Sequence, residues 1–185
     1  EKLKEFFPLN QVLTGVFSIA KRLYGLRFEQ DAAIPVYHNE VTAYRVFDEH
    51  GAFKALLYCD FHPRPSKRDG AWMTSFKTQH KTSQENHRPH ISIVCNFTHP
   101  DAEGIALLTF QEVTTLFHEF GHALHGMLAD TNYPSLSGTN VSWDFVELPS
   151  QIMENWCFQK ESLSLFAKHY KSQEPLPPAY LEQIN

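Results

Sequence analysis

The run His118-Glu119-Phe120-Gly121-His122 has the residue types and the spacing of a site that binds and uses a metal ion. In a helix, residues four apart lie on one face with their Cβ atoms about 5–6 Å apart, so His118 and His122 would point the same way. Two imidazoles placed like this can bind one Zn²⁺ at about 2.0–2.1 Å each. Glu119 lies about 100° further around the helix, near the metal but not aimed at it, which suits a general base acting on metal-bound water.

The motif by itself is moderately specific. The chain has 11 His and 14 Glu among its 185 residues, and these frequencies give about 0.05 matches to His-Glu-x-x-His by chance. The context makes the match more specific, because the motif falls in a capped helix that follows a strand and precedes a loop and another helix. The simpler alternative is a pair of buried histidines with a structural role.

A catalytic zinc needs a third protein ligand and an open fourth position. One extension of the motif continues with Gly and then His at fixed positions, but here those positions hold His125 and Leu128, which excludes that class. The other class takes a Glu from the next helix. Glu147 and Glu154 both qualify, since they are seven residues apart and lie on similar faces. Glu147 is preferred, because it follows a loop near the start of that helix, where the chain returns to the first one.

Two neighbouring residues keep alternative roles at this stage. Glu154 could accept a hydrogen bond from a zinc-bound imidazole or lie on a solvated helix face, and neither role is favoured. His125 lies three residues after His122 on much the same face. A structural role for His125 is favoured over one that supports the metal ligands.

The first half of the chain predicts one helix and one hairpin. Apolar residues recur at helical spacing between a proline and a glycine, which predicts a helix over about 9–24. Two apolar runs over 41–47 and 52–61, with a turn at 48–51, predict a β-hairpin. The prolines and charges of 62–70 predict a surface loop whose basic residues are solvated, namely Arg64, Lys67 and Arg68.

The second half surrounds the motif with further elements. Alternating apolar residues predict a strand over 90–97. Thr109 followed by Glu112 forms a capping box that begins the helix carrying the motif. Residues 131–141 are expected to form a loop. Beyond it we expect a second helix from near Asp144 or Pro149, further helix over 162–170, and a break at 174–178.

The composition excludes several classes of protein. The length corresponds to about one domain, and 42% hydrophobic and 14% aromatic residues exclude a disordered chain. The net charge of −5 argues against nucleic acid or an anionic membrane as partner. The chain has neither an apolar run long enough for a membrane span nor a signal-peptide pattern at its start. Three widely spaced cysteines indicate free thiols and a cytoplasmic location, with the periplasm as the alternative.

Several segments together resemble one family. Residues 116–125 closely resemble the signature of the thimet oligopeptidase-like zinc peptidases, and 144–151 and 154–156 match the same family further on. The sequence Leu-Ser-Gly-Thr-Asn at 136–140 most resembles the bacterial peptidyl-dipeptidase branch of this family. Earlier stretches are also similar, so the resemblance spans nearly the whole chain.

The resemblance implies an α+β, mainly helical fold: a zincin-like core with a small sheet beside the motif helix. It implies one zinc ion with His118, His122 and Glu147 as ligands and Glu119 as the base. It also implies metal-assisted hydrolysis of short peptides and release of C-terminal dipeptides by the whole enzyme. The short run 70–73 is then the edge strand that pairs with an extended peptide.

Family members are several times longer and carry a later His- and Tyr-rich segment that nothing after Trp156 matches. Residues 1–185 are therefore expected to be a single catalytic-core fragment of a longer metallopeptidase. The alternatives are a zinc-binding module without turnover and a purely structural helical domain. The oligomeric state and the peptide preference stay open.

Overall fold

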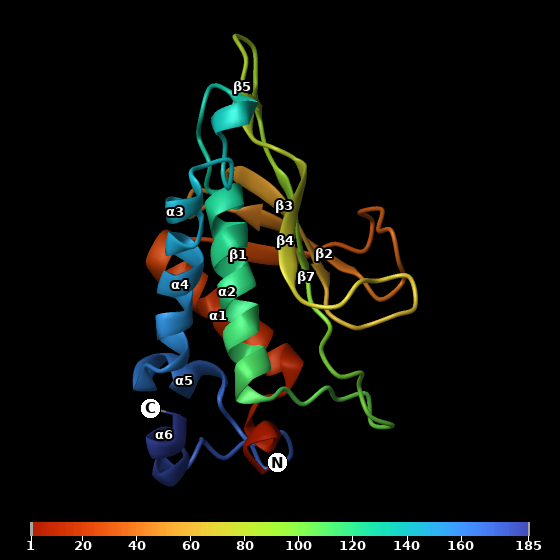
Figure 1. The fold of residues 1–185 in the computed structure, drawn as a ribbon, viewed down its shortest axis with the longest axis vertical. Coiled ribbons are helices and arrows are strands. Elements are labelled where there is room, and N and C mark those ends of the chain that lie inside the picture. Colours follow the sequence, from red (N-terminus) through yellow and green to blue (C-terminus); the bar gives the residue numbers. More distant parts are fainter. Residues whose placement is uncertain (1, 185) are drawn as a thin grey trace.

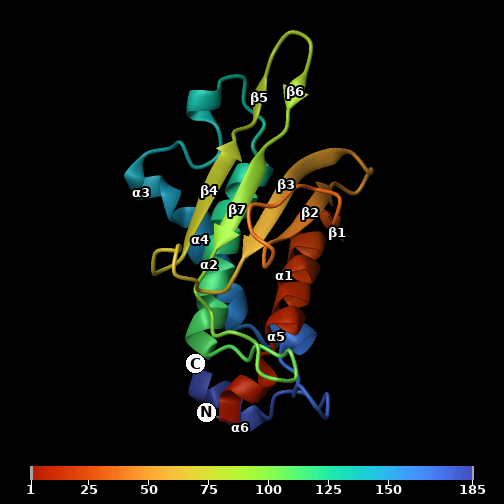
Figure 2. The ribbon, with the colours of Figure 1, turned by 90° about the vertical axis from the view of Figure 1, so that its right-hand side faces the viewer.

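The computed structural model describes residues 2–184, and a five-stranded mixed sheet forms one layer of them (Figure 1). The strands lie in the order β1-β2-β3-β7-β4, in which β3 and β7 are parallel and the other neighbours are antiparallel. With the sheet facing the viewer, the main helices lie behind it and cover one face (Figure 2). The strands are β1 (Arg27–Gln30), β2 (Thr42–Phe47), β3 (Phe53–Asp60), β4 (Trp72–Lys77) and β7 (His90–Val94).

The hairpin predicted from the two apolar runs is confirmed as β2 and β3. The Asp48 carboxylate closes its turn by accepting hydrogen bonds from the backbone N–H groups of His50 at 3.0 Å and Ala52 at 2.9 Å. Gly51 supplies the left-handed conformation, with φ of 81°. A second hairpin, β5 (His80–Lys81) and β6 (Asn86–His87), protrudes from one end (Figure 2). It was not predicted, because two-residue strands carry no alternating pattern.

The loop at 62–70 is confirmed, but the expected solvation of its basic residues is wrong for two of them. The guanidinium of Arg64 and the ammonium of Lys67 both donate to the carboxylate of Asp60, at 2.8 to 3.0 Å. Asp60 and the Lys67 side chain are only 1% and 2% exposed. Arg68 is exposed, as expected. The loop is therefore anchored to the end of β3 by a buried ion pair.

The helix predicted at the start is confirmed as α1 (Leu9–Tyr24). Pro8 precedes it, and Gly25 ends it with a φ of 68°. The apolar face of α1 packs against the sheet and the neighbouring helices, and the ring of Phe17 stacks on Phe28 of β1 with centroids 4.1 Å apart.

The helix that carries the motif is α2 (Phe110–Met127), which packs against β3, β4 and β7. Its predicted capping box is confirmed. The Glu112 backbone N–H donates to Thr109 Oγ1 at 3.1 Å, and the Thr109 N–H donates to the Glu112 carboxylate at 2.7 Å. Ten residues of α2 are buried, so tertiary packing and capping both fix its position.

The chain after α2 is more broken than the sequence predicts. The expected loop contains the short η2 (Pro134–Leu136), and the expected second helix is divided at Glu147 into α3 (Trp143–Val146) and α4 (Leu148–Glu154). The expected helix over 162–170 is α5 (Lys160–Phe166) and ends four residues early. Ala167 leaves helical geometry with ψ of 78°, and a bridge pairs Lys168 with Pro175. The remaining elements are η1 (Lys2–Phe6), η3 (Asn155–Cys157) and α6 (Pro178–Ile184).

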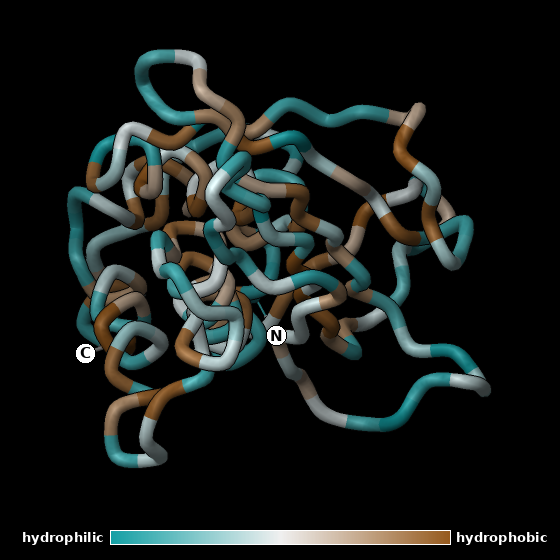
Figure 3. The backbone as a smooth tube through the Cα atoms, turned by 90° about the horizontal axis from the view of Figure 1, so that it is seen from above, coloured by the Kyte–Doolittle hydropathy of each residue, from teal (hydrophilic) through white to brown (hydrophobic). Residues whose placement is uncertain are grey.

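The hydrophobic core lies between the sheet and the helices. Many hydrophobic segments lie among the closely packed elements, and the loop that protrudes at the lower right is mostly hydrophilic or neutral (Figure 3). Large side chains that are essentially inaccessible to solvent come from both layers, including Phe117 and Phe120 of α2, Ile91 and Ile93 of β7, and Phe166 of α5. The core therefore seats α2 directly on the sheet.

The fold is α+β, with a small mixed sheet beside the motif helix, as expected. Helical residues make up 38% of the chain, so helix is the commonest regular structure without forming the majority. Cys59, Cys95 and Cys157 are buried and free. Within residues 2–184, no helix combines the length and the apolar character that crossing a membrane requires.

Candidate metal centre

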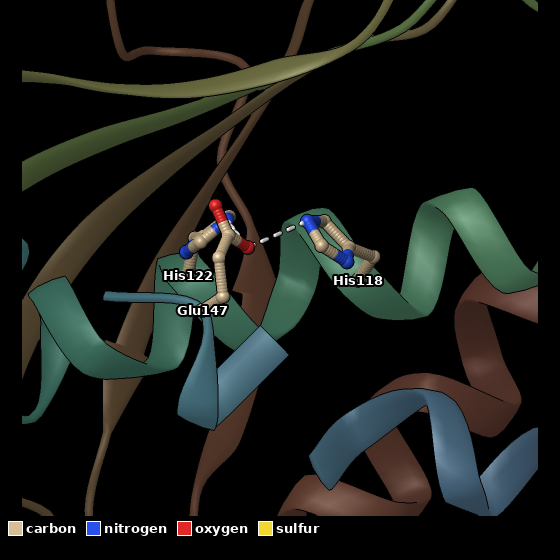
Figure 4. A group of neighbouring side chains, drawn as sticks. All are labelled: His118, His122 and Glu147. Carbon is tan, nitrogen blue, oxygen red and sulfur yellow. Dashed lines mark ion pairs between the residues drawn. The ribbon is translucent and has the colours of Figure 1, made fainter. Parts of the chain in front are cut away.

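His118 and His122 lie one turn apart on the exposed side of α2 and point the same way (Figure 4). Their rings are 4.9 Å apart between centroids and nearly perpendicular, at 84°. Both side chains are partly buried, with 27% and 12% of their surface exposed. The helix therefore presents two imidazole nitrogens to one point in space, as the spacing predicted.

Glu147 reaches the same point from the junction of α3 and α4 (Figure 4). Its Oε2 lies 3.2 Å from His118 Nε2 and 3.2 Å from His122 Nε2. The three ligand atoms lie within 4.8 Å of one another, and the three residues form the metal-compatible group found in residues 2–184. The preference for Glu147 over Glu154 as the third member of the cluster agrees with this geometry.

The cluster has dimensions that fit a metal ion. In a tetrahedral zinc site with bonds of about 2.0–2.1 Å, neighbouring ligand atoms are about 3.3 Å apart. Both nitrogen–oxygen distances are close to that value. Two imidazole nitrogens and one carboxylate oxygen also form the donor set of catalytic sites that leave a fourth position open.

Ser150 holds the carboxylate of Glu147 in place. Its hydroxyl lies 2.8 Å from both Glu147 Oε2 and the Glu147 carbonyl oxygen. Ser150 is fully buried, whereas about half of the Glu147 side chain is exposed. The hydrogen bond from Ser150 is the largest cause that lowers the pKa of Glu147, and the two histidines add to it against the effect of burial. Sequence reasoning missed Ser150; its position three residues after Glu147, in the first turn of α4, is the signal that could have found it.

The glycine of the motif lets α4 approach α2. A Cβ atom at Gly121 would lie 2.5 Å from the carbonyl oxygen of Pro149 and 2.5 Å from Ser150 Cα. No side chain larger than hydrogen fits there without a backbone shift. Because Glu147 begins the same helix, Gly121 sets how closely the third member of the cluster approaches the two histidines.

Glu154 fixes the orientation of the His118 ring. Its Oε1 lies 2.5 Å from His118 Nδ1, on the side of the ring that faces away from Glu147. With a proton on Nδ1 shared with this carboxylate, Nε2 keeps its lone pair for a metal. The structure thus favours the first of the two roles open to Glu154.

His122 and His125, on the same face of α2, lack a partner within residues 2–184 that would fix the orientation of their rings as Glu154 does for His118. His122 Nδ1 and His125 Nδ1 are both buried without a hydrogen-bond partner among the described residues. Burial lowers the pKa of each imidazole, which favours the neutral form that binds metals. His125 lies outside the cluster and packs edge-on against Phe145 at 6.1 Å, in line with the structural role preferred for it.

Glu119 lies on α2 beside the cluster but takes no part in it. It is 6% exposed, and its Oε2 has no hydrogen-bond partner among the described residues. Burial raises the pKa of Glu119 to about 7; the nearby His118 opposes the shift and Glu147 adds to it. A buried carboxylate with a free oxygen and a pKa near neutrality can exchange a proton with a bound molecule.

A cleft of about 570 Å³ opens over the cluster. The start of β4, at the edge of the sheet, forms one wall, and the segment 139–147 forms the other. Its lining includes the three cluster residues and Glu119. The other lining residues are mostly apolar, with one hydroxyl and one amide side chain: Ala71, Trp72, Met73, Thr139, Asn140, Val141, Trp143 and Val146. The cleft is open to solvent and reaches the start of β4.

A buried glutamine positions the second wall of this cleft. The Gln79 side chain is 0% exposed and accepts a hydrogen bond from the Thr131 backbone N–H at 2.8 Å. Its amide nitrogen donates to the Thr131 carbonyl at 3.0 Å and to Asn86 Oδ1 at 2.9 Å. The loop after α2 is therefore tied to the end of the sheet before it enters the cleft wall.

The whole chain, residues 1–185, matches the model of a protein family described as Peptidase family M3. Among individual relatives, the dipeptidyl carboxypeptidase of Escherichia coli is 47% identical over 177 residues, which cover 95% of this chain and 26% of that enzyme.

Oligopeptidases are similar over the same region. Oligopeptidase A of Salmonella typhimurium is 40% identical over all of this chain and 27% of its own length. An organellar oligopeptidase A of Arabidopsis thaliana is 44% identical over all of this chain and 24% of its own. The chain thus spans about a quarter of the length of these relatives.

Proposed function

The chain belongs to peptidase family M3, and from this premise we propose that residues 1–185 form the single catalytic core of a longer zinc peptidase. The fold proposed for this core is the zincin type, a small sheet beside the helix of the metal motif. The observation that carries the proposal is the approach of Glu147 to within 3.2 Å of both motif histidines.

Zinc is the metal that best suits this donor set. Imidazole nitrogens with one carboxylate oxygen favour zinc over calcium or magnesium, which prefer oxygen ligands alone. His118, His122 and Glu147 would hold the ion. When bound, zinc would supply Lewis-acid chemistry, making water acidic enough to react near pH 7 and polarising a carbonyl group.

Glu119 is proposed as the residue that moves protons. Its Oε2 has no partner among the described residues, so it can accept a proton from the attacking water and donate it to the leaving amine. The Glu154 carboxylate keeps the His118 ring in the orientation that leaves Nε2 toward the metal. Ser150 keeps the Glu147 carboxylate aimed at the same point.

The peptide is proposed to lie along β4. This strand ends the sheet, so one of its two edges lacks a neighbouring strand within the described residues. Ala71, Trp72 and Met73 line the cleft beside the metal cluster. A peptide that adds to a free strand edge gains backbone hydrogen bonds whatever its side chains are, which suits an enzyme for short peptides.

The proposed product is a C-terminal dipeptide. The relative named dipeptidyl carboxypeptidase is 47% identical to this chain, and the segment 136–140 leads into the cleft wall, where Thr139 and Asn140 line the cleft. In a time course on blocked peptides of five to nine residues, mass spectrometry is expected to detect dipeptides cut successively from the C-terminus. Cleavage confined to the middle of the peptides would contradict this product assignment.

Metal content and cleavage, measured on the same samples, test the main proposal. We expect one zinc per chain and a Glu119→Gln variant that keeps the zinc but cleaves about 10²–10⁴-fold more slowly. Because the chain spans a quarter of its relatives, the alternative is a zinc-binding core without turnover. Bound zinc with no Glu119-dependent cleavage would support that alternative, and a chain that binds no zinc would contradict both.

A further inference from the structure

The direction of β4 sets which end of a bound peptide meets which part of the cleft. Antiparallel pairs are more stable per residue than parallel ones, so a peptide added to this edge is expected to run against β4. Its C-terminal side then lies at the beginning of the strand, where Ala71 and Trp72 line the cleft. The residues just before β4 are therefore placed to contact the part of the peptide that follows the cleaved bond.

Arg68 lies at this position with its side chain and backbone both held. Its guanidinium carbon lies 4.2 Å from the centroid of the Trp72 ring, a cation–π contact. The Asn96 side-chain amide donates to the carbonyl oxygens of Arg68 at 3.0 Å and Gly70 at 2.7 Å. Arg68 therefore loses less conformational entropy when it binds a ligand than a free surface arginine does.

The charge of Arg68 is not used within the described part of the chain. No ion pair joins its guanidinium to a carboxylate among residues 2–184. Arg64 and Lys67, its neighbours in the same loop, both donate hydrogen bonds to the carboxylate of Asp60. The cleft itself is lined by no Lys or Arg within the described residues. Arg68 thus holds a free positive charge against Trp72, which lines a cleft whose own ionisable groups are imidazoles and carboxylates.

We propose that Arg68 is a specificity-determining residue that binds a carboxylate of the peptide on the C-terminal side of the cleaved bond. This inference rests on the proposed peptidase function. The planar guanidinium can make paired hydrogen bonds to a carboxylate while its face remains on the Trp72 ring. The carboxylate can come from the C-terminus of the peptide or from an acidic side chain near it, and the experiment separates these two sources.

The test measures peptide binding by calorimetry to the zinc-loaded protein with Glu119→Gln, which prevents turnover. The first pair of ligands is N-acetyl-alanyl-phenylalanyl-alanyl-alanine with a free and with an amidated C-terminus. Both peptides of the second pair have an amidated C-terminus, and they differ in having glutamate or glutamine as the third residue. Each ligand is measured with Arg68→Gln, Arg68→Lys and a matched control, Arg27→Gln. Arg27 also lies over an aromatic ring, 5.2 Å from Phe47, but on β1 at the opposite edge of the sheet.

The parent protein in this test is the zinc-loaded Glu119→Gln protein with Arg68 unchanged. In it, we expect the charged peptide of at least one pair to bind about tenfold more tightly than the neutral peptide of that pair. Arg68→Gln should remove that preference without changing the affinity for the neutral peptide or for zinc. Arg68→Lys should retain part of it, and Arg27→Gln should retain all of it. The pair that loses its preference identifies the source of the carboxylate.

Two results would overturn the assignment of Arg68: a preference that survives Arg68→Gln, or a parent protein that shows no preference in either pair. If the parent protein binds none of the four peptides, the proposal that the cleft binds peptides is contradicted, and so is the role of Arg68 that depends on it. That outcome is distinct from peptide binding without discrimination, which leaves the cleft in place and removes Arg68 alone.

Discussion

At the scale of single residues, two of the three cluster side chains are oriented by partners that do not join the cluster. Glu154 contacts the far nitrogen of His118, and Ser150 donates to the carboxylate of Glu147. His122 has no such partner among the described residues. Partners of this kind fix the ring orientation and the basicity of metal ligands, so their loss should weaken metal binding without removing a ligand.

The first prediction concerns Glu154. Replacing it by alanine should weaken zinc binding about 10–100-fold, because His118 Nδ1 loses the carboxylate that fixes its tautomer. Glu154→Gln should weaken it less, since the amide oxygen can still accept the hydrogen bond. Competition against a chelator of known affinity measures both. Glu161→Ala, an exposed position in the first turn of α5, is the matched control, and an equal loss in that variant would contradict the role of Glu154.

The second prediction concerns Ser150. Ser150→Ala should raise the pKa of Glu147 toward its usual value and make zinc binding several-fold weaker below neutral pH, where protons compete for the carboxylate. Ser164 is the matched control, because its hydroxyl donates a similar bond to the backbone carbonyl three residues earlier but does not line the cleft over the cluster. Zinc titrations at two pH values test this. If both variants behave alike, Ser150 has no particular effect on Glu147.

At the scale of elements, the contact between α2 and α4 brings the cluster together. A Cβ atom at Gly121 would overlap backbone atoms of Pro149 and Ser150, which cannot move aside as a flexible side chain can. We predict that Gly121→Ala destabilises the fold by about 1–3 kcal/mol and also weakens zinc binding, because α4 must move away from α2.

A second helical glycine separates these two effects. A Cβ atom at Gly15 of α1 would lie 2.5 Å from the side chain of Phe166, and neither residue lines the cleft over the cluster. Gly15→Ala should therefore lower the unfolding free energy and leave the zinc affinity of the folded protein unchanged. Urea unfolding and zinc titration on both variants check this. Unchanged zinc affinity in Gly121→Ala would show that this helix contact does not position Glu147.

Elements with strong local signals could be predicted from the sequence. Pro8 and Gly25 enclose α1, the capping box begins α2, and a turn within residues 48–52 joins β2 to β3. Elements decided by tertiary contacts could not. β1 is a short, largely polar strand that forms by pairing with β2. Pro149 in the first turn of α4 is a local signal for the division of the second helix. The early end of α5 leaves no such signal.

The same distinction applies to the site. The two histidines share a helix, so their spacing alone predicts that they meet, and Glu147 follows from the return of the chain. Ser150, Glu154 and Arg68 act through contacts whose geometry depends on how α4 and the loop 62–70 pack. Sequence patterns do not decide between the two possible roles of Glu154. They also predict that the basic residues of the loop 62–70 are solvated, whereas Lys67 is buried in an ion pair with Asp60.

At the scale of the whole molecule, a buried charge network joins the sheet to the loop that leads into β4. The Asp60 carboxylate accepts hydrogen bonds from Arg64, Lys67 and Tyr37 at 2.8 to 3.0 Å. Burial acts to raise the pKa of Asp60, but the hydrogen bonds from these residues outweigh it and hold the pKa below its usual value. The network therefore stabilises the fold only while Asp60 is ionised.

The pH dependence of stability follows from this lowered pKa. Asp60 has a pKa of about 3.9 in the unfolded chain and a lower one in the fold, so its contribution is complete above the unfolded value. It is lost as the pH falls through the folded pKa. We predict that Asp60→Asn lowers the unfolding free energy by about 3–5 kcal/mol at pH 7, because it leaves the buried Lys67 without a counter-charge.

Urea unfolding between pH 2 and pH 7 measures this effect. The Asp60→Asn curve should be flatter at acid pH than that of the parent, whereas exposed Asp144→Asn should follow the parent. Two parallel curves for the parent and Asp60→Asn would contradict the contribution of the buried network. Because the network anchors the loop that carries Arg68, its loss should also weaken peptide discrimination.

The central claim, a zinc ion held by His118, His122 and Glu147, is tested most directly by a crystal structure of the zinc-loaded protein with anomalous data at the zinc edge. We predict one zinc peak, with both histidine Nε2 atoms about 2.0–2.1 Å away and a Glu147 oxygen about 2.0–2.2 Å away. A zinc ion bound elsewhere, or bound to the histidines with the Glu147 carboxylate turned away, would contradict the claim.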